Sequence, residues 1–355
     1  MLRDFDFSSL ARANSLAVSC SASIRHQTGS FQVDEVLPFK PDGEGGHVWL
    51  KIRKSGINTD WLANELAHFA EVPQVAVGYA GLKDRHAVTT QWFSIKVEGL
   101  TEPEWSDFKI ANIEIVEQTR HGKKLKRGVL AGNIFDLHLT EMTGAPELWQ
   151  EHLELISKQG VPNYFAEQRF GRQANNLHAV GNWFSTGKGP KKRQQKSMYL
   201  SSARSWLFNL ILDQRLRLGN WNKAIEGDVM LLAGTKASLF NAELSDTVLQ
   251  SRVNKMDIHP TGPLWGKGKP LTQNECLALE QQVLMSWDDW QSGLEKAGMK
   301  QERRALRLYP QGIEWEYLAD NELQLRFFLP AGSYATAVMR ELAVLFDASN
   351  SLPAV

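Results

Sequence analysis

Alternating apolar and polar side chains dominate the first third of the chain. The clearest cases, with the two-residue period of a half-buried β-strand, are residues 31–36, 47–52, 90–97 and 132–139. Shorter stretches of the same pattern occur at residues 75–79 and 113–116. One helix interrupts them, because Asn58 and Thr59 offer an N-cap and Leu62, Leu66 and Phe69 follow at helical spacing.

Helical spacing becomes the main pattern after Gly160. Broad or striped apolar faces predict helices at residues 202–218, 274–286, 288–297 and 337–346. Strand patterns return at residues 306–310, 313–317 and 323–329. The sequence therefore predicts an α+β fold with a mixed, largely antiparallel sheet. The β-rich halves predict one discontinuous domain, residues 1–159 and 309–355, with a more helical α+β insertion domain at residues 160–308.

The balance of charge is neutral, with 40 basic and 40 acidic residues among 355, and this argues against a general nucleic-acid binder. The basic residues are nevertheless grouped. The candidates for contacts to the phosphates of a nucleic-acid backbone are Lys123, Lys124, Lys126 and Arg127 in one run, and Lys191, Lys192 and Arg193 in a second. Solvated loops are an equally good explanation of such runs by themselves.

Several classes of protein do not fit the sequence. No apolar run approaches the ~20 residues of a membrane helix, and the N-terminus lacks the order of a signal peptide. Cys20 and Cys276 lie far apart, which predicts reduced thiols, a cytoplasmic protein and no structural zinc. There is no glycine-rich phosphate loop, dinucleotide fingerprint or metal-binding cluster, so we expect no cofactor and no metal.

One carboxylate has an unusual setting. Asp84 lies in a short connection between two predicted strands, and its neighbours are Lys83, Arg85 and His86. It should be ionised at neutral pH and held on a rigid frame, as catalytic carboxylates are. An ordinary solvated turn is the alternative, and the local chemistry alone favours it.

Three motifs in this order resemble those of the tRNA pseudouridine synthase D (TruD) family. They are Gly-Leu-Lys-Asp-Arg-His-Ala-Val-Thr-Thr-Gln at residues 81–91, Asn-Tyr-Phe-Ala-Glu-Gln-Arg-Phe-Gly at residues 163–171, and Leu-Pro-Ala-Gly-Ser-Tyr-Ala-Thr at residues 329–336. The resemblance implies a pseudouridine synthase-type catalytic domain with a family-specific insertion. It also implies that Asp84 is the catalytic residue.

The implied reaction is the isomerisation of a uridine in tRNA, at uridine 13. The C1′–N1 bond breaks, the uracil rotates, and it is rejoined through C5 without any redox change. Asp84 could attack as a nucleophile or remove the C2′ proton, and the sequence leaves both routes open. Lys83, Arg85 and Arg25 are the candidates for the cation beside Asp84. The resemblance favours Arg25, and the alternative is a solvated surface arginine. Lys83 either supports the active site or faces a phosphate.

The target uridine must leave its stack to reach a protein carboxylate. By resemblance, Phe135 packs on the base, Asn133 is a polar substrate contact, and Phe31 and Tyr334 are further aromatic contacts. Relatives often have Phe where Tyr334 stands. Core packing of Phe31 and Phe135, and a turn cap at Asn133, are the alternatives.

The expected partner is tRNA, with no membrane and no obligate protein partner, and a monomer is sufficient. Two other functions compete with the isomerase. A non-catalytic RNA-binding protein or chaperone would use the same basic runs. A glycoside or nucleoside hydrolase would normally need a second carboxylate near Asp84, and that group would have to arrive by folding.

Overall fold

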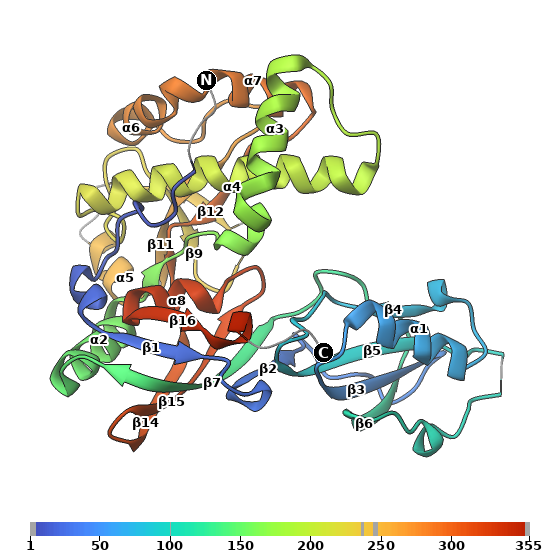
Figure 1. The fold of residues 1–355 in the computed structure, drawn as a ribbon. Helices are drawn as coiled ribbons and strands as arrows, with labels where there is room; N and C mark the ends of the chain where they lie inside the picture. Colours follow the sequence, from blue (N-terminus) through green and yellow to red (C-terminus); the bar gives the residue numbers. More distant parts are fainter. Residues whose placement is uncertain (1–4, 100, 236–237, 244–247, 352–355) are drawn as a thin grey trace. The chain divides into compact units, whose positions relative to one another are not determined.

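Except at residues 306–310, the strands that the alternation predicts assemble into one mixed sheet in the computed structural model (Figure 1). Its main path runs β14-β15-β7-β2-β5-β3-β6, and β1, β16 and β4 join at its sides. The strands are β1 Ser21–Ile24, β2 Phe31–Val36, β3 His47–Ser55, β4 Val77–Tyr79, β5 Val88–Lys96, β6 Ile113–His121, β7 Gly132–Thr143, β14 Gln311–Ala319, β15 Glu322–Pro330 and β16 Val344–Asp347. The pairs β2–β5 and β1–β16 are parallel and the others are antiparallel, which confirms the predicted fold class.

The structure describes residues 5–99, 101–235, 238–243 and 248–351. The chain forms two compact units. Unit 2 comprises Val18–Pro146, Pro310–Gly332 and Ala343–Val355, and it holds the mixed sheet. Unit 1 comprises Met1–Ala17, Glu147–Tyr309 and Ser333–Leu342. The insertion domain predicted at residues 160–308 stays a prediction.

Helix α1, Thr59–Phe69, covers part of the mixed sheet in unit 2. The Asn58 side chain accepts a hydrogen bond from the backbone N–H of Asp60 (2.8 Å), as the predicted N-cap requires. Leu62 and Leu66 are fully buried beside the sheet residue Phe93. Burial of each leucine stabilises this packing by about 1.5–3 kcal/mol.

Unit 1 is built around the long helix α4. Its helices are α2 Pro146–Gln159 (from Glu147), α3 Asn175–Thr186, α4 Arg193–Arg217, α5 Leu249–Asn254, α6 Asn274–Leu284, α7 Asp288–Lys296 and α8 Ala335–Leu342. Its strands are β8 Val161–Pro162, β9 Val229–Leu232, β10 Leu239–Asn241, β11 Ile258–Leu264, β12 Glu302–Ala305 and β13 Arg307–Leu308. Trp206, Leu207 and Ile211 of α4 lie in the core. Within the described residues, no helix has both the length and the apolarity to cross a membrane.

Some predicted elements were wrong in part. Of the strand predicted over residues 306–310, only Arg307–Leu308 form β13, which pairs with β8 in unit 1. The helix predicted over residues 337–346 ends at Leu342, and Val344–Asp347 form strand β16, which pairs in parallel with β1 (Figure 1). Pairing with β1 satisfies backbone groups of these β-favouring residues, beginning with Val344 N–H to the Cys20 carbonyl (2.9 Å). The strand predicted over residues 75–79 begins only at Val77, because Gln74–Ala76 form a 3₁₀ turn after Pro73.

Candidate active site

The sheet places the predicted aromatic and polar residues of β2 and β7 on one face. In this antiparallel pair Glu35 lies opposite Asn133, and Val33 lies opposite Phe135. Directly opposed residues project from the same face, and alternation adds Phe31 to it. The rings of Phe31 and Phe135 meet edge to face, with centroids 6.4 Å apart. This face of the sheet therefore carries two aromatic rings, the carboxylate of Glu35 and the amide of Asn133.

The loop that carries Asp84 is tied to α1 and β5. The hydroxyl of Thr59 accepts a hydrogen bond from the backbone N–H of Lys83 and donates one to Oε1 of Gln91, both at 3.1 Å. Nε2 of Gln91 in turn donates to the Gly81 carbonyl (2.6 Å). Thr59 and Gln91 are buried, so these bonds hold the loop firmly before Asp84.

Arg25 pairs with Asp84 in the structure. Its Nη2 lies 3.0 Å from Oδ2 of Asp84, and its guanidinium lies 4.2 Å above the centroid of the Phe31 ring. Arg25 is buried at 7% exposure, whereas 36% of the Asp84 side chain is exposed. The other oxygen of Asp84, Oδ1, accepts from the backbone N–H of His86 (2.9 Å). Asp84 is thus oriented from two sides and still open to a substrate.

A second carboxylate, which the sequence did not predict, shares the Arg25 guanidinium. Oδ2 of Asp347 lies 2.6 Å from Nη1 of Arg25. Burial alone would raise the pKa of Asp347, but hydrogen bonds from Ser349 and the charge of Arg25 outweigh it and lower the pKa. The parallel β1–β16 pairing brings Asp347 to this position, beside Ile24. No local signal could reveal it, because Asp347 directly follows a segment, residues 337–346, whose pattern predicted a helix.

Lys83 is paired with a different acid. Its Nζ lies 2.8 Å from Oε1 of Glu35 and 2.8 Å from Oδ1 of Asn133. The Glu35 side chain is fully buried, and its Oε2 accepts from the backbone N–H of Trp92 (3.0 Å). Burial raises the pKa of Glu35, and Lys83 opposes that effect. Sequence reasoning missed Glu35, although its place on the apolar side of the strand pattern was a usable signal.

Lys54 of β3 completes the charged cluster. Its side chain is 1% exposed, and its Nζ donates to the Ile57 carbonyl (2.8 Å). Burial, assisted by the charge of Lys83, lowers the pKa of Lys54 to about 8. The cluster comprises the cations Arg25, Lys54 and Lys83 and the carboxylates Glu35, Asp84 and Asp347. Buried charges are costly unless opposite charges lie close by, and the three cations and three carboxylates of this cluster meet that requirement.

Other predicted residues have different surroundings. Tyr334 belongs to unit 1, where its ring centroid lies 6.2 Å from that of Phe165. Lys191, Lys192 and Arg193 are exposed in unit 1, at the start of α4. Lys123, Lys126 and Arg127 are exposed after β6 in unit 2, whereas Nζ of Lys124 donates to the Val75 carbonyl.

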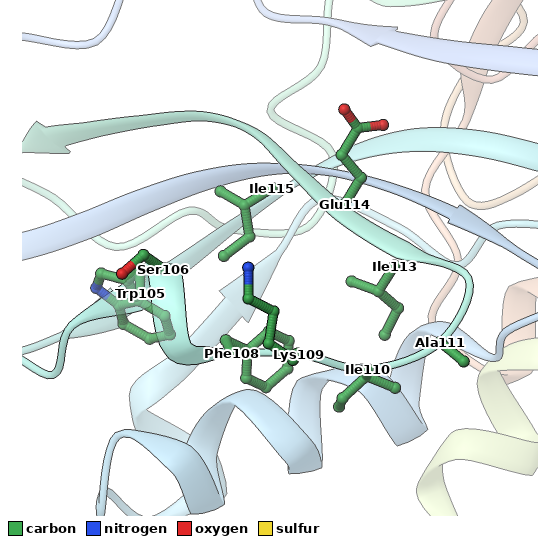
Figure 2. Close-up of a pocket in the computed structure, with 9 residues that line it drawn as sticks. All are labelled: Trp105, Ser106, Phe108, Lys109, Ile110, Ala111, Ile113, Glu114 and Ile115. Carbon is green, nitrogen blue, oxygen red and sulfur yellow. The ribbon is translucent and has the colours of Figure 1, made fainter.

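A groove of about 520 Å³ in unit 2 involves none of the predicted residues (Figure 2). Residues from Trp105 to Ile115 line it, and the carboxylate of Glu114 points away from the other side chains. Its mixture of apolar side chains with one lysine and one glutamate offers no arranged reactive pair. Among the described residues, no group of three or more His, Cys, Asp or Glu side chains could hold a metal ion.

Comparison with known proteins agrees with the motifs. The family model of tRNA pseudouridine synthase D (TruD) matches residues 17–192 and 188–342. A tRNA pseudouridine synthase D from Nitrosococcus oceani is 47% identical over 91% of this chain and 90% of its own. One from Methylococcus capsulatus is 43% identical over 96% of both chains. A crystal structure described as TruD from Methanosarcina mazei has a similar fold, with a TM-score of 0.73, 20% identity and coverage of 94% of this chain and 95% of its own.

Proposed function

Because the chain belongs to the tRNA pseudouridine synthase D family, a family of isomerases, we propose that it converts uridine 13 of tRNA to pseudouridine with Asp84 as the catalytic carboxylate. The observation that carries the proposal is the pairing of Asp84 with Arg25 on the aromatic face of β2 and β7. An ionised, oriented and partly exposed carboxylate is what the first step needs.

Arg25 serves to hold the Asp84 side chain in place. Its guanidinium is fixed by Asp347 on one side and by the Phe31 ring beneath it, so it loses little freedom when the substrate binds. The Oδ2 atom of Asp84 is occupied by Arg25 and Oδ1 by the His86 N–H. Each oxygen keeps a second lone pair, which can attack carbon or accept the C2′ proton.

Phe31 and Phe135 lie mostly below the protein surface, beneath the site. Each is under a tenth exposed, and the Phe135 ring also stacks on Phe327 at 5.7 Å. We propose that their rings form the apolar surface against which Arg25 and the flipped uracil pack. Asn133 supplies a hydrogen bond to the base, and Tyr334 is a further aromatic substrate contact, as the family resemblance suggests.

The direct test uses purified protein, with no added metal or nucleotide, and an unmodified tRNA transcript. We expect conversion of uridine 13 alone, and no conversion when that position is cytidine. Release of free uracil would instead indicate a hydrolase, with Asp347 as the second carboxylate. Binding without any conversion of a transcript that has uridine 13 would favour the RNA-binding alternative. Conversion of another uridine would contradict the assigned position only.

The exposed basic loop after β6 gives a second expectation. Replacing Lys123 and Lys126 by glutamine should weaken tRNA binding and reduce the slope of log K against log salt by about 0.7–0.9 for each phosphate that the variant no longer neutralises. Lys109→Gln, an exposed lysine outside the basic runs, is the matched control and should leave the slope unchanged. An identical slope in the double variant would remove this loop from the RNA interface.

We also propose that one chain is sufficient for activity in the cytoplasm. The contacts of Asp84, Arg25, Lys83 and Asn133 with one another and with Glu35 and Asp347 all lie within unit 2 of one chain.

A further inference from the structure

The side-chain amide of Asn133 has a defined orientation. Lys83 Nζ lies 2.8 Å from one of its atoms, and an ammonium group donates hydrogen bonds but accepts none. The amide atom that faces Lys83 must therefore be the oxygen Oδ1. Since the amide is planar, its NH₂ group lies at the opposite corner, away from Lys83.

Glu35 keeps Lys83 in this position. The fully buried carboxylate receives the Trp92 N–H on one oxygen and Lys83 on the other. Glu35 also lies directly opposite Asn133 in the β2–β7 register, so carboxylate, ammonium and amide are neighbours on one face. A buried carboxylate without a cation is costly, and therefore Lys83 cannot easily turn towards another partner.

The NH₂ group of Asn133 is available to a ligand. Within the described part of the chain, no protein acceptor takes a hydrogen bond from Nδ2 of Asn133, and the side chain is half-buried. Asn133 shares its face of β7 with Phe135, and its partner Lys83 immediately precedes Asp84. The two N–H donors therefore belong to an amide whose oxygen is held by the residue that precedes the proposed catalytic carboxylate.

We infer that Glu35 and Lys83 lock Asn133 as a hydrogen-bond donor to position 4 of the flipped base, and so make the site selective for uracil over cytosine. Uracil carries a carbonyl oxygen at C4, and cytosine carries an amino group there. An NH₂ group that faces another amino group leaves donors unsatisfied on both sides. The inference rests on the proposed function, and Glu35 and Lys83 act in it as positioning residues.

The first test measures binding rather than conversion. Two transcripts, with uridine or cytidine at position 13, are titrated against the wild type and Asn133→Ala. The wild type should prefer uridine by about tenfold or more, and the variant should lose most of this preference. Using the same two RNAs for both proteins cancels differences in RNA folding. An equal preference in both proteins would overturn the inference.

The second test separates positioning from simple support. In Lys83→Gln the residue can donate or accept, so the Asn133 amide is free to turn and the preference should fall. Lys83→Arg, which only donates, should retain it. If a folded Lys83→Gln protein prefers the uridine transcript as strongly as the wild type does, the positioning role of Lys83 is refuted. If Lys83→Gln does not fold, the result for Asn133→Ala decides whether the inference holds. Conversion of the uridine transcript is scored separately, so that its failure counts against the proposed function alone.

Discussion

Asp84→Asn is expected to lower the rate of pseudouridine formation by about a thousandfold or more while tRNA affinity stays within about threefold. Asparagine has nearly the same shape, but its single carbonyl oxygen can take the place of only one of the two oxygens that accept from the His86 N–H and from Arg25. It cannot act as a carboxylate nucleophile or remove the C2′ proton. Single-turnover conversion and equilibrium binding of the same transcript measure the two quantities independently.

Asp34→Asn is the matched control for this variant. Asp34 is half-buried next to Glu35 on β2, and strand alternation places it on the other face of the sheet from Phe31 and Glu35. It should convert tRNA at the wild-type rate. If Asp84→Asn converts as fast as Asp34→Asn, Asp84 is not the catalytic residue and the proposed mechanism fails.

Asp228→Asn is expected to cause the largest loss of stability in unit 1, about 3–5 kcal/mol. Asp228 is fully buried and receives both terminal nitrogens of Arg215 (3.0 and 2.9 Å), the Ile225 N–H and the Cys276 thiol. Burial would lower the pKa of Arg215, and Asp228 outweighs that effect and raises it. Without the carboxylate charge, the buried guanidinium is left uncompensated.

Urea unfolding followed by tryptophan fluorescence measures this loss, since Trp206 and Trp221 lie in the same core as Cys276. The control is Glu154→Gln, which breaks the exposed pair between Glu154 and Lys158 on α2. That pair is solvated, so we expect no measurable shift of the transition. A shift for Asp228→Asn no larger than for the control would show that the buried pair does not stabilise unit 1.

The strand pattern carried most of the fold information for unit 2. Phe31 and Val33 alternate with Gln32 and Asp34, and the structure buries both apolar side chains, as the pattern predicts. The helix after Asn58 was equally predictable, because its cap and its apolar stripe are local. The pattern failed at residues 344–346, which were predicted to continue a helix and instead form most of strand β16.

By itself, the sequence determined the fold class, the family motifs, and Asp84, Asn133 and Phe135 as candidate site residues, because strand periodicity and short motifs are local properties. Only the tertiary structure decided which charges meet. Arg25 reaches Asp84 across 59 residues, Asp347 joins them from the far end of the chain, and Lys83 pairs with Glu35 rather than with its neighbour Asp84. Strand pairing brings these groups within 3.0 Å, and the electrostatic energy of an ion pair depends on that distance and on burial, neither of which a linear sequence displays.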